Sequence, residues 1–564
     1  MTETNDNNIR NDGDIYKVVE EWCTDPNAAK SKYGDICDWN TSAVTTMKEL
    51  FKEKADFNDD IGKWDVSNVT DMVGMFEKAT SFNRDISKWN VSNVRDMNGM
   101  FFSASAFNQD ISQWDVSNVT NMSEMFAEAS LFNQDISGWN MCNVSDISYM
   151  FMEAPQFNQP IGKWNVSNIT DMSSLFYEVT AFNQDISQWN VSQVTTMWRM
   201  FGKAKSFNQD ISHWNVSNVT DMSSMFNGAT KFNQNIGDWD VSKVTNMSEM
   251  FSEASSFNQD ISKWDVSNVT NTSYMFMRGK EFNQDISQWN VSNVTKMSFM
   301  FEESVKFNHN ISQWDVSNVT DMNGMFEKAE SFNQDISGWN VSKVTNTRHM
   351  FDMALDFNQN IGNWNINQVK DMGCMFDNAS AFDVKYVSHW NLNDYMQQLY
   401  CNIRTNKDIR EAVFATFGKH KDILKPTVPD PSRWKHRYIK KGSPLKKKYG
   451  NPGEWDVSRV TNMSNLFEGI LLDDCEFLRS WDVSNVTDMS YMFYDVIGLT
   501  KLDSISEWNI SNVKNMSCMF GKSNMSVDIS LWDISNVNDK ESMFQEGTVS
   551  NIQTDTVFNM NSTN

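Results

Sequence analysis

The 564-residue sequence is poor in residues that interrupt regular structure and in residues that carry chemistry. It contains only 8 Pro, 23 Gly, 7 Cys and 6 His. Gly is too sparse for a collagen-like chain, and Cys is too sparse for a disulfide scaffold. No C-x-x-C pair occurs and no two histidines stand four apart, so common zinc and redox motifs are excluded. A Cys23–Cys37 disulfide is left open for an oxidising compartment, but we expect two buried free thiols.

Long apolar runs and enzyme motifs are also missing. No run of 18 apolar residues occurs, so no membrane span is expected, and the polar start of the chain predicts no secretory signal peptide. G-x-S-x-G, P-loop and G-x-G-x-x-G motifs do not occur, so we expect no enzyme, no catalytic residue and no bound cofactor. The formal net charge of −25 argues against nucleic acid and anionic lipid as partners.

What the sequence does contain is a repeat. Fourteen tryptophans from Trp39 to Trp364 are spaced by 25 residues without insertion or deletion, and Trp390 follows after 26. The unit reads F-N-Q-D-I-S-x-W-[DN]-V-S-N-V-T-[DN]-M-S-x-M-F-x-x-A-x-x. Each unit is too short to form a core alone, but stacked units bury one continuously, and a fixed length keeps the apolar positions in register. The repeat therefore predicts a solenoid.

The pattern within the unit predicts its local structure. F-N-Q-D-I-S-x-W has aromatic and Ile positions with few helix formers, which favours a strand. V-T-[DN]-M-S-x-M-F-x-x-A has apolar residues at steps of three and four, which favours a short helical or 3₁₀ segment. We therefore expect an α/β repeat solenoid, a right-handed coil like that of leucine-rich repeats, with a parallel β-sheet and a helical N-cap.

Two segments have the pattern of caps. Ile15, Val18, Val19 and Trp22 predict an amphipathic helix near the start, and a similar pattern recurs from Ile409. A basic, Pro-rich stretch follows the second helix, and the charge run is read as a solvated linker. The predicted organisation is an N-terminal helical cap at 1–38, a main solenoid at 39–401, a second cap-like helix with its linker at 402–454, a short irregular second solenoid at 455–544 and a polar tail at 545–564.

One row of candidate site residues is acidic. The Asp before the repeat Ile recurs at Asp60, Asp85, Asp110, Asp135, Asp185, Asp210, Asp260, Asp285 and Asp335. Stacked carboxylates suit Ca²⁺, so a calcium ladder is one interpretation. The favoured interpretation is that each Asp accepts backbone N–H bonds at a turn, because Asn replaces it in some coils and satisfies a turn without charge.

A second row varies in polarity while the core positions stay fixed. It lies just before the repeat Trp, where we expect solvent exposure, and ordinary surface drift explains its variation equally well. Its partner-contact candidates are Lys63, Lys88, Gln113, Lys163, Gln188, His213, Asp238 and Lys263. The Asn after the repeat Phe, as at Asn58 and Asn83, is expected to bond the next coil's backbone instead of a ligand.

The repeat F-N-Q-D-I-S-x-W-x-V-S-N-V-T-x-M-S-x-M-F resembles that of BspA-like leucine-rich-repeat surface proteins, densely over 39–390 and loosely over 455–544. The resemblance implies a non-enzymatic, adhesin-like scaffold at the cell surface or outside the cell, with a protein or glycan bound on the sheet face. A structural, calcium-stabilised surface or virion protein without a discrete ligand is the alternative. The ligand, the compartment and the oligomeric state are not specified by the sequence.

Overall fold

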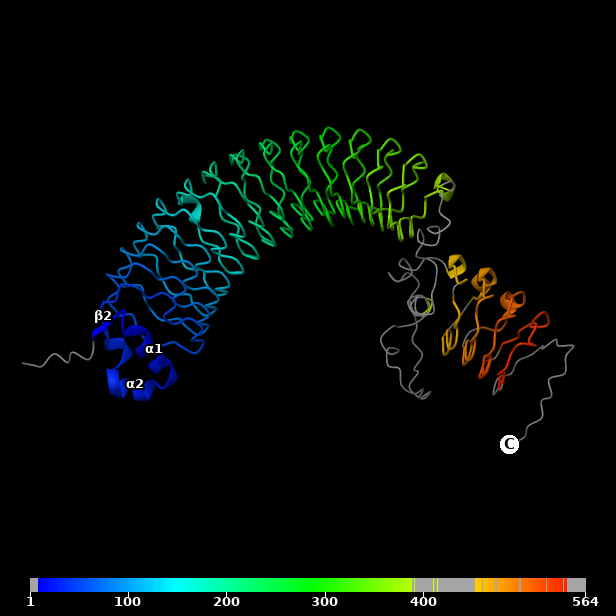
Figure 1. Ribbon diagram of the computed structural model, residues 1–564, viewed down its shortest axis with the longest axis horizontal. Coiled ribbons are helices and arrows are strands. Elements are labelled where there is room, and N and C mark those ends of the chain that lie inside the picture. Colours follow the sequence, from blue (N-terminus) through cyan, green and yellow to red (C-terminus); the bar gives the residue numbers. More distant parts are fainter. Residues whose placement is uncertain are drawn as a thin grey trace, which may run out of the picture. The chain divides into compact units, whose positions relative to one another are not determined.

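Two compact units, residues 1–392 and 393–564, divide the chain in the computed structural model. The structure describes residues 9–387 and 390, then 409, 413 and 452–544 except 459, 471, 473, 497, 498, 524 and 541. The predicted linker, most of the predicted second cap and the polar tail lie outside the described residues. Each unit is considered by itself, and the first is drawn from blue to yellow-green in Figure 1.

Two helices precede the first coil. Helix α1 (Ile15–Thr24) buries the four apolar residues that predicted it, and α2 (Pro26–Tyr33) begins where the Asp25 carboxylate accepts the N–H groups of Asn27 and Ala28. The ring of Trp22 in α1 packs edge-on against Trp39, with centroids 5.7 Å apart. Helix α1 therefore lies against the first repeat. A short strand, β1 (Ile9–Asn11), pairs in parallel with β2 (Asn40–Ala43), and η2 (Ile36–Asp38) precedes β2.

The core of the first unit consists of aromatic columns. The ring of Phe76 stacks on Phe82 of its own coil at 3.9 Å and on Phe101 of the next coil at 5.5 Å. The indole N–H of Trp89 donates to the carbonyl of Ile61 in the preceding coil, at 3.2 Å. These contacts recur along the unit, and the repeated Phe, Ile and Trp side chains are buried. The stack thus satisfies each buried indole while removing its ring from water.

Coils are joined by a backbone ladder in a segment where we expected a short helix. Parallel bridges run through Asp71, Asp96 and Asn121 and through their equivalents in later coils. Within residues 71–79, alternate N–H groups donate to the next coil, those of Met75, Glu77 and Ala79 close turns three residues back, and that of Val73 donates to the Asp71 carboxylate. Residues 71–79 and their equivalents are called the ladder segment. Its donors to the next coil are Met72, Gly74, Phe76 and Lys78, with N–O distances of 2.7–3.0 Å.

The predicted strand is wrong, and so is the broad sheet built from it. Phe57, Ile61 and Trp64 are all buried at steps of four and three, so the segment does not alternate between two faces as a strand does. One such segment forms a 3₁₀ helix, η3 (Ile161–Lys163). In the segment from the repeat Phe to the repeat Trp, side chains join neighbouring coils in place of a backbone ladder. The Oδ1 of Asn58 accepts the backbone N–H of Asn83 at 3.0 Å, and this contact recurs in the later coils, which confirms the Asn ladder expected from the sequence.

The ladder segment requires left-handed backbone at two positions in every coil. In the first unit these are residue 49 and residue 53 and their 25-residue equivalents through 374 and 378. Of the 28 positions only four are glycine, namely Gly74, Gly99, Gly228 and Gly324. The other 24 hold ordinary residues with φ between 52° and 61°, a region that disfavours a Cβ by about 1–2 kcal/mol. Strain of this kind is therefore distributed along the whole ladder.

The first unit curves because its coils are closer together on one side. Parallel hydrogen bonding holds ladder segments about 4.8 Å apart. Equivalent rings are 5.5 Å apart for Phe76 and Phe101, but 6.4 Å apart for Trp89 and Trp114. The ladder therefore lies toward the inner side of the arc and the Trp turns toward the outer side, where Figure 1 shows η3 in cyan. The described part of this unit ends near η4 (Val384–Val387).

The second unit repeats the same construction with irregular coils. Its helices are η7 (Pro452–Glu454), η8 (Glu476–Ser480) and η9 (Asp503–Ile505), and parallel bridges join Asn462, Asp488 and Asn515. Ile409 and Val413 are helical and belong to the same buried cluster as Trp455. This contact is what a cap on the second array requires. The predicted domain boundaries themselves stay a prediction.

The left-handed ladder predicts the effect of single substitutions. Gly99 has φ +57°, and an added Cβ would meet nothing closer than Phe102 Cβ at 3.7 Å. Gly99→Ala should therefore lower the free energy of unfolding by about 1 kcal/mol through conformation alone. Glu124→Gly should leave stability equal or slightly raised, because relief of strain exceeds the backbone entropy of glycine. Gly138→Ala, where a Cβ meets nothing within 4 Å, is the neutral control. If denaturant unfolding gave the same free energy of unfolding for Gly99→Ala and Gly138→Ala, the assignment of left-handed backbone at residue 99 would be contradicted.

Candidate interaction surface

The predicted partner-contact row lies on the Trp turns at the outer side of the arc. All eight residues are exposed: Lys63, Lys88, Gln113, Lys163, Gln188, His213, Asp238 and Lys263. Three of them form ion pairs between adjacent coils, because Lys63 Nζ lies 3.2 Å from Asp38 and Lys263 Nζ lies 3.0 Å from Asp238. The row is accessible, and its role in partner contact stays a prediction.

The acidic row forms turns. The Oδ1 of Asp85 accepts the backbone N–H of Ser87 at 2.9 Å, and Asn310 makes the same bond to Ser312 at 2.9 Å. Hydrogen bonds from the Ser side chain and backbone lower the pKa of the Asp85 carboxyl. The remaining Asp residues of the row make the same contact two residues on. In the part of the chain that the structure describes, no group of three or more His, Cys, Asp or Glu side chains is placed to hold a metal ion.

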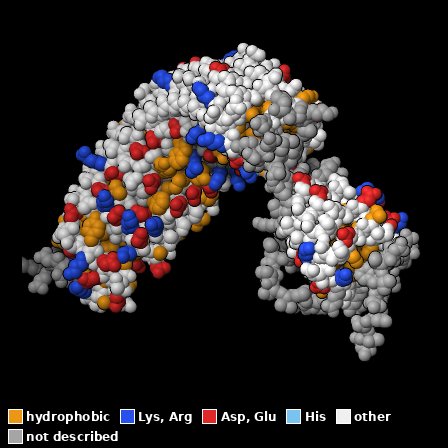
Figure 2. All heavy atoms as spheres, turned by 45° about the vertical axis from the view of Figure 1, so that its right-hand side comes forward, with side chains coloured by type: hydrophobic (Ala, Val, Ile, Leu, Met, Phe, Trp, Pro, Cys, Tyr) orange, Lys and Arg blue, Asp and Glu red, His pale blue; other side chains and the backbone are white. Residues whose placement is uncertain are grey.

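The ladder segment presents a second, different surface. In each coil its apolar side chains, such as Met72, Met75 and Phe76, point into the core. Between them lie residues 73, 74, 77 and 78 and their 25-residue equivalents, whose exposure ranges from buried, as for Ser174 and Ser252, to exposed, as for Lys78. These side chains, from Lys48 to Asn378, are called the ladder face. Figure 2 shows hydrophobic side chains gathered among charges of both signs on one side of the first unit.

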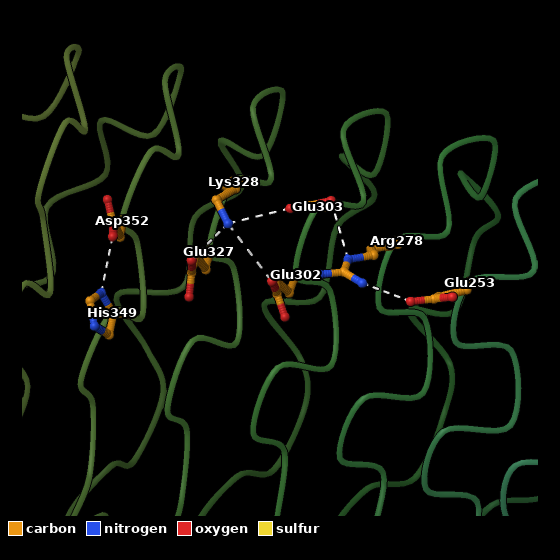
Figure 3. Close-up of polar contacts among 8 residues, drawn as sticks. All are labelled: Glu253, Arg278, Glu302, Glu303, Glu327, Lys328, His349 and Asp352. Carbon is orange, nitrogen blue, oxygen red and sulfur yellow. Dashed lines mark hydrogen bonds and ion pairs between the residues drawn. The ribbon is translucent and has the colours of Figure 1, made fainter. Parts of the chain in front are cut away.

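The ladder face carries an ion-pair network that crosses four coils (Figure 3). Arg278 lies between Glu253, at 2.7 Å, and Glu303, at 3.4 Å. Lys328 contacts Glu303 at 3.3 Å and Glu327 at 3.0 Å. Charges of alternating sign thus neutralise each other from coil to coil. A hollow of about 370 Å³ beside them is lined by Lys280, Glu303, Val305, Lys328, Glu330 and Met353.

Burial and hydrogen bonding shift the pKa values of several side chains at this end of the ladder face. Glu302 is buried, and burial together with the charge of Glu327 raises the pKa of its carboxyl. The ring of His349 bonds the Asp352 carboxylate at 3.0 Å, and this bond raises the pKa of the imidazole. The His349–Asp352 pair lies within one coil, and Glu302 lies 3.8 Å from Lys328 of the next coil. They do not converge with a nucleophile on a common point, as catalysis would require.

Aromatic side chains form two half-exposed clusters elsewhere on the ladder face. The rings of Tyr274 and Phe299 stack at 5.0 Å between adjacent coils. Tyr149 and Trp198 meet at 6.3 Å across an intervening coil. The Arg199 guanidinium lies 4.7 Å from the Trp198 ring centroid. Half-exposed Tyr and Trp with Arg are the side chains most enriched at protein interfaces.

The sequence interpretation missed the ladder face, although the repeat contained the signal. The candidate row was chosen because its polarity varies, yet the positions written x in M-S-x-M-F-x-x-A vary more, from Gly to Tyr, Arg and Phe. The sequence pattern predicts a helix for this segment, and variable residues on the outer side of a helix are ordinarily explained by solvent exposure alone. The structure places them instead on the hydrogen-bonded ladder.

The cysteines add no site. Cys23 and Cys37 are free, as expected, but half-buried instead of buried. Burial raises the pKa of each thiol to about 11, which makes both poor nucleophiles. Cys374 is disulfide-bonded. No helix among the described residues is long and apolar enough to cross a membrane.

Fold and surface together define a repeat solenoid protein built from stacked 25-residue coils. More particularly, the chain belongs to the family described as "Mycoplasma protein of unknown function, DUF285". Matches to the family model cover residues 24–139, 88–188, 109–214, 160–243, 209–309, 279–390 and 442–560. No curated protein matches the sequence.

Solved structures that align with the chain are distant. The crystal structure of a TLR13–ssRNA13 complex aligns at 11% identity and a TM-score of 0.18, over 69% of this chain and 59% of that one. The functional domain of InlJ from Listeria monocytogenes, which includes a cysteine ladder, aligns at 11% identity and a TM-score of 0.21, over 63% of this chain and 77% of that one. At these scores neither structure informs the function of this protein.

The Asp turns predict how stability depends on pH. A carboxyl whose pKa is lowered by folding stabilises the native state above its unfolded pKa, and this contribution is lost as pH falls through the folded pKa. Replacing Asp85, Asp110 and Asp135 by Asn should therefore flatten the fall in melting temperature below about pH 4, with a small effect because the groups are exposed. Ala at the same positions should lower the melting temperature at pH 7 as well. If the melting temperatures of wild type and the Asn variant fell equally with decreasing pH, the Asp charges would make no contribution to stability.

Proposed function

We propose that the protein is a non-enzymatic scaffold that binds a protein or glycan ligand on its ladder face. The observation that carries this proposal is the strain of the ladder. Twenty-four left-handed positions hold side chains where glycine would be relaxed, and those side chains differ in chemistry from coil to coil. Left-handed residues that persist against their strain are characteristic of binding sites, because the side chain is needed. The resemblance of the repeat to that of BspA-like surface proteins agrees with this role.

The contrast with the rest of the coil supports the same surface. Turn positions recur with little change because they carry structural bonds: Asp60 closes a turn by accepting the N–H of Gly62, and Asn58 accepts the N–H of Asn83 in the next coil. On the ladder face the backbone already joins every coil, and side chains that also pair between coils, such as Arg278 with Glu253, do so only in some of them. Its side chains are therefore free to vary for recognition. Location at the cell surface belongs to this proposal and follows from the resemblance alone.

A matched pair of variants tests the proposal. The full chain is presented to an array of oligosaccharides and to a displayed library of random peptides. A ladder variant carries Tyr149→Ser, Trp198→Ser, Tyr274→Ser and Phe299→Ser, each of which installs the residue of another coil at that column. An outer variant carries Lys63→Ala, Lys88→Ala, Lys163→Ala and Lys263→Ala. The ladder variant should lose about tenfold or more in affinity and keep its melting temperature, and the outer variant should bind normally. The reverse result would move the binding surface to the outer side.

The alternative role, a structural protein stabilised by calcium, rests on the acidic row. The charges of Asp85 and Asp135 act to raise the pKa of Asp110, although its turn bonds outweigh them. A cation would relieve this repulsion. The alternative predicts a melting temperature that rises with millimolar calcium and falls with chelator, measured by circular dichroism. An unchanged melting temperature in both conditions would leave only the turn interpretation.

A further inference from the structure

One tryptophan of the main solenoid stands outside the repeat. Trp198 is the only Trp between Trp39 and Trp390 that breaks the 25-residue register. The register tryptophans donate their indole N–H to a backbone carbonyl, as Trp189 does to Ile161 at 3.1 Å. Within the described residues, Trp198 Nε1 has no hydrogen-bond partner, and its side chain is half-buried on the ladder face. Its donor is therefore available to a ligand.

The aromatic and Arg side chains around Trp198 pack against one another. The Arg199 guanidinium lies 4.7 Å from the Trp198 centroid and 5.5 Å from that of Tyr177. Tyr177 packs over Gly202, where an added Cβ would come within 2.8 Å of its ring. Tyr149 touches Trp198 from two coils away. Tyr149, Tyr177, Trp198 and Arg199 are called the Trp198 cluster. Rings fixed in this way bind at low entropic cost.

Small polar residues border the cluster on both sides. Between Tyr149 and Trp198 the ladder face carries Ser173 and Ser174, and beyond Trp198 it carries Ser223, Ser224, Asn227 and Gly228. Rigid Tyr and Trp with Arg, set among Ser, Gly and Asn, is the composition of surfaces that recognise proteins.

Unpaired acidic groups lie on the coils just before the cluster. Glu124, Glu128 and Glu153 occupy the ladder face, and no ion pair to any of them occurs among the described residues. This differs from the alternating network of Arg278 and Lys328. Burial and the charges of Glu178 and Glu128 raise the pKa of Glu153, although the charge of Lys203 acts to lower it. A partner with Lys or Arg at this place would supply the missing charge.

We propose that the Trp198 cluster anchors a protein partner whose contact segment places an aromatic or aliphatic side chain beside a lysine or arginine. The apolar side chain packs against Tyr149 and Trp198, and the cation faces Glu128 and Glu153. The inference rests on the proposed function of the ladder face and specifies the class of partner and its point of attachment.

Peptide selection on the full chain tests the proposal. A displayed library of random 12-residue peptides is selected on wild type, and the enriched peptides are synthesised and titrated. Enriched sequences should combine an aromatic or aliphatic residue with Lys or Arg. Trp198→Ser, which installs the residue of Ser173 and Ser223, should weaken them about thirtyfold or more. Glu153→Lys, with Lys native at the equivalent Lys78 and Lys203, should weaken them and shift selection toward acidic sequences.

A control on the same face separates failure of this inference from failure of the proposed function. If Tyr274→Ser abolished peptide binding and Trp198→Ser did not, the inference about Trp198 would be wrong, but the ladder face would still be the binding surface. Peptides insensitive to both, but lost with the outer lysine variant, would overturn both. Acidic consensus sequences would overturn the partner chemistry. If the protein bound an oligosaccharide through Trp198 and bound no peptide, the proposed class of partner would be wrong, but binding on the ladder face would be supported. Unchanged circular dichroism of each variant shows that its fold is retained.

Discussion

Hydrogen bonding between equivalent residues of successive coils is the constraint on which this protein depends. In the ladder segment every second N–H reaches the next coil, and the N–H groups between them close turns within the coil. No donor is left over, but the alternation forces two left-handed residues into each coil. It also fixes the register within the ladder segment, since a residue inserted there would exchange the two sets of N–H groups and turn core side chains outward. Coil length outside the segment can differ, as the bridges from Asn462 to Asp488 and from Asp488 to Asn515 show in the second unit.

The same constraint separates structure from recognition. Where side chains close turns or join coils, as Asp85 and Asn58 do respectively, the residue type is tied to the fold. Where coils are joined by backbone, the fold does not dictate the side chain, and Tyr149, Trp198 and Arg278 stand at positions that hold other residues in other coils. The inner, closely spaced side of the first unit is thus the side whose side chains the backbone ladder leaves free to vary.

Charge is used in two ways along the ladder face. Between Glu253 and Lys328, opposite charges alternate and satisfy each other, so this stretch is stable as it stands. Exposed pairs of this kind each contribute little, although a network contributes more. Between Glu124 and Glu153 the charges share one sign, which disfavours burial and favours a cationic partner. A surface of nearly constant shape therefore offers chemically distinct places along its length.

The sequence by itself determined that the chain is a solenoid, where its core lies and which Asn and Asp residues are structural. The strict spacing of Trp64, Phe57 and Ile61 required stacking, and interchange of Asp with Asn at positions such as Asn310 pointed to turns. It also predicted α1 from the spacing of Val18, Val19 and Trp22. Apolar periodicity did not identify the ladder, because a chain of consecutive turns and a short helix bury the same residues, Met72, Met75 and Phe76. Only the tertiary structure decided between them. Left-handed backbone at every second turn directs the N–H groups to the next coil instead of along a helix axis, and this brings side chains from separate repeats, Tyr149 and Trp198, into one surface.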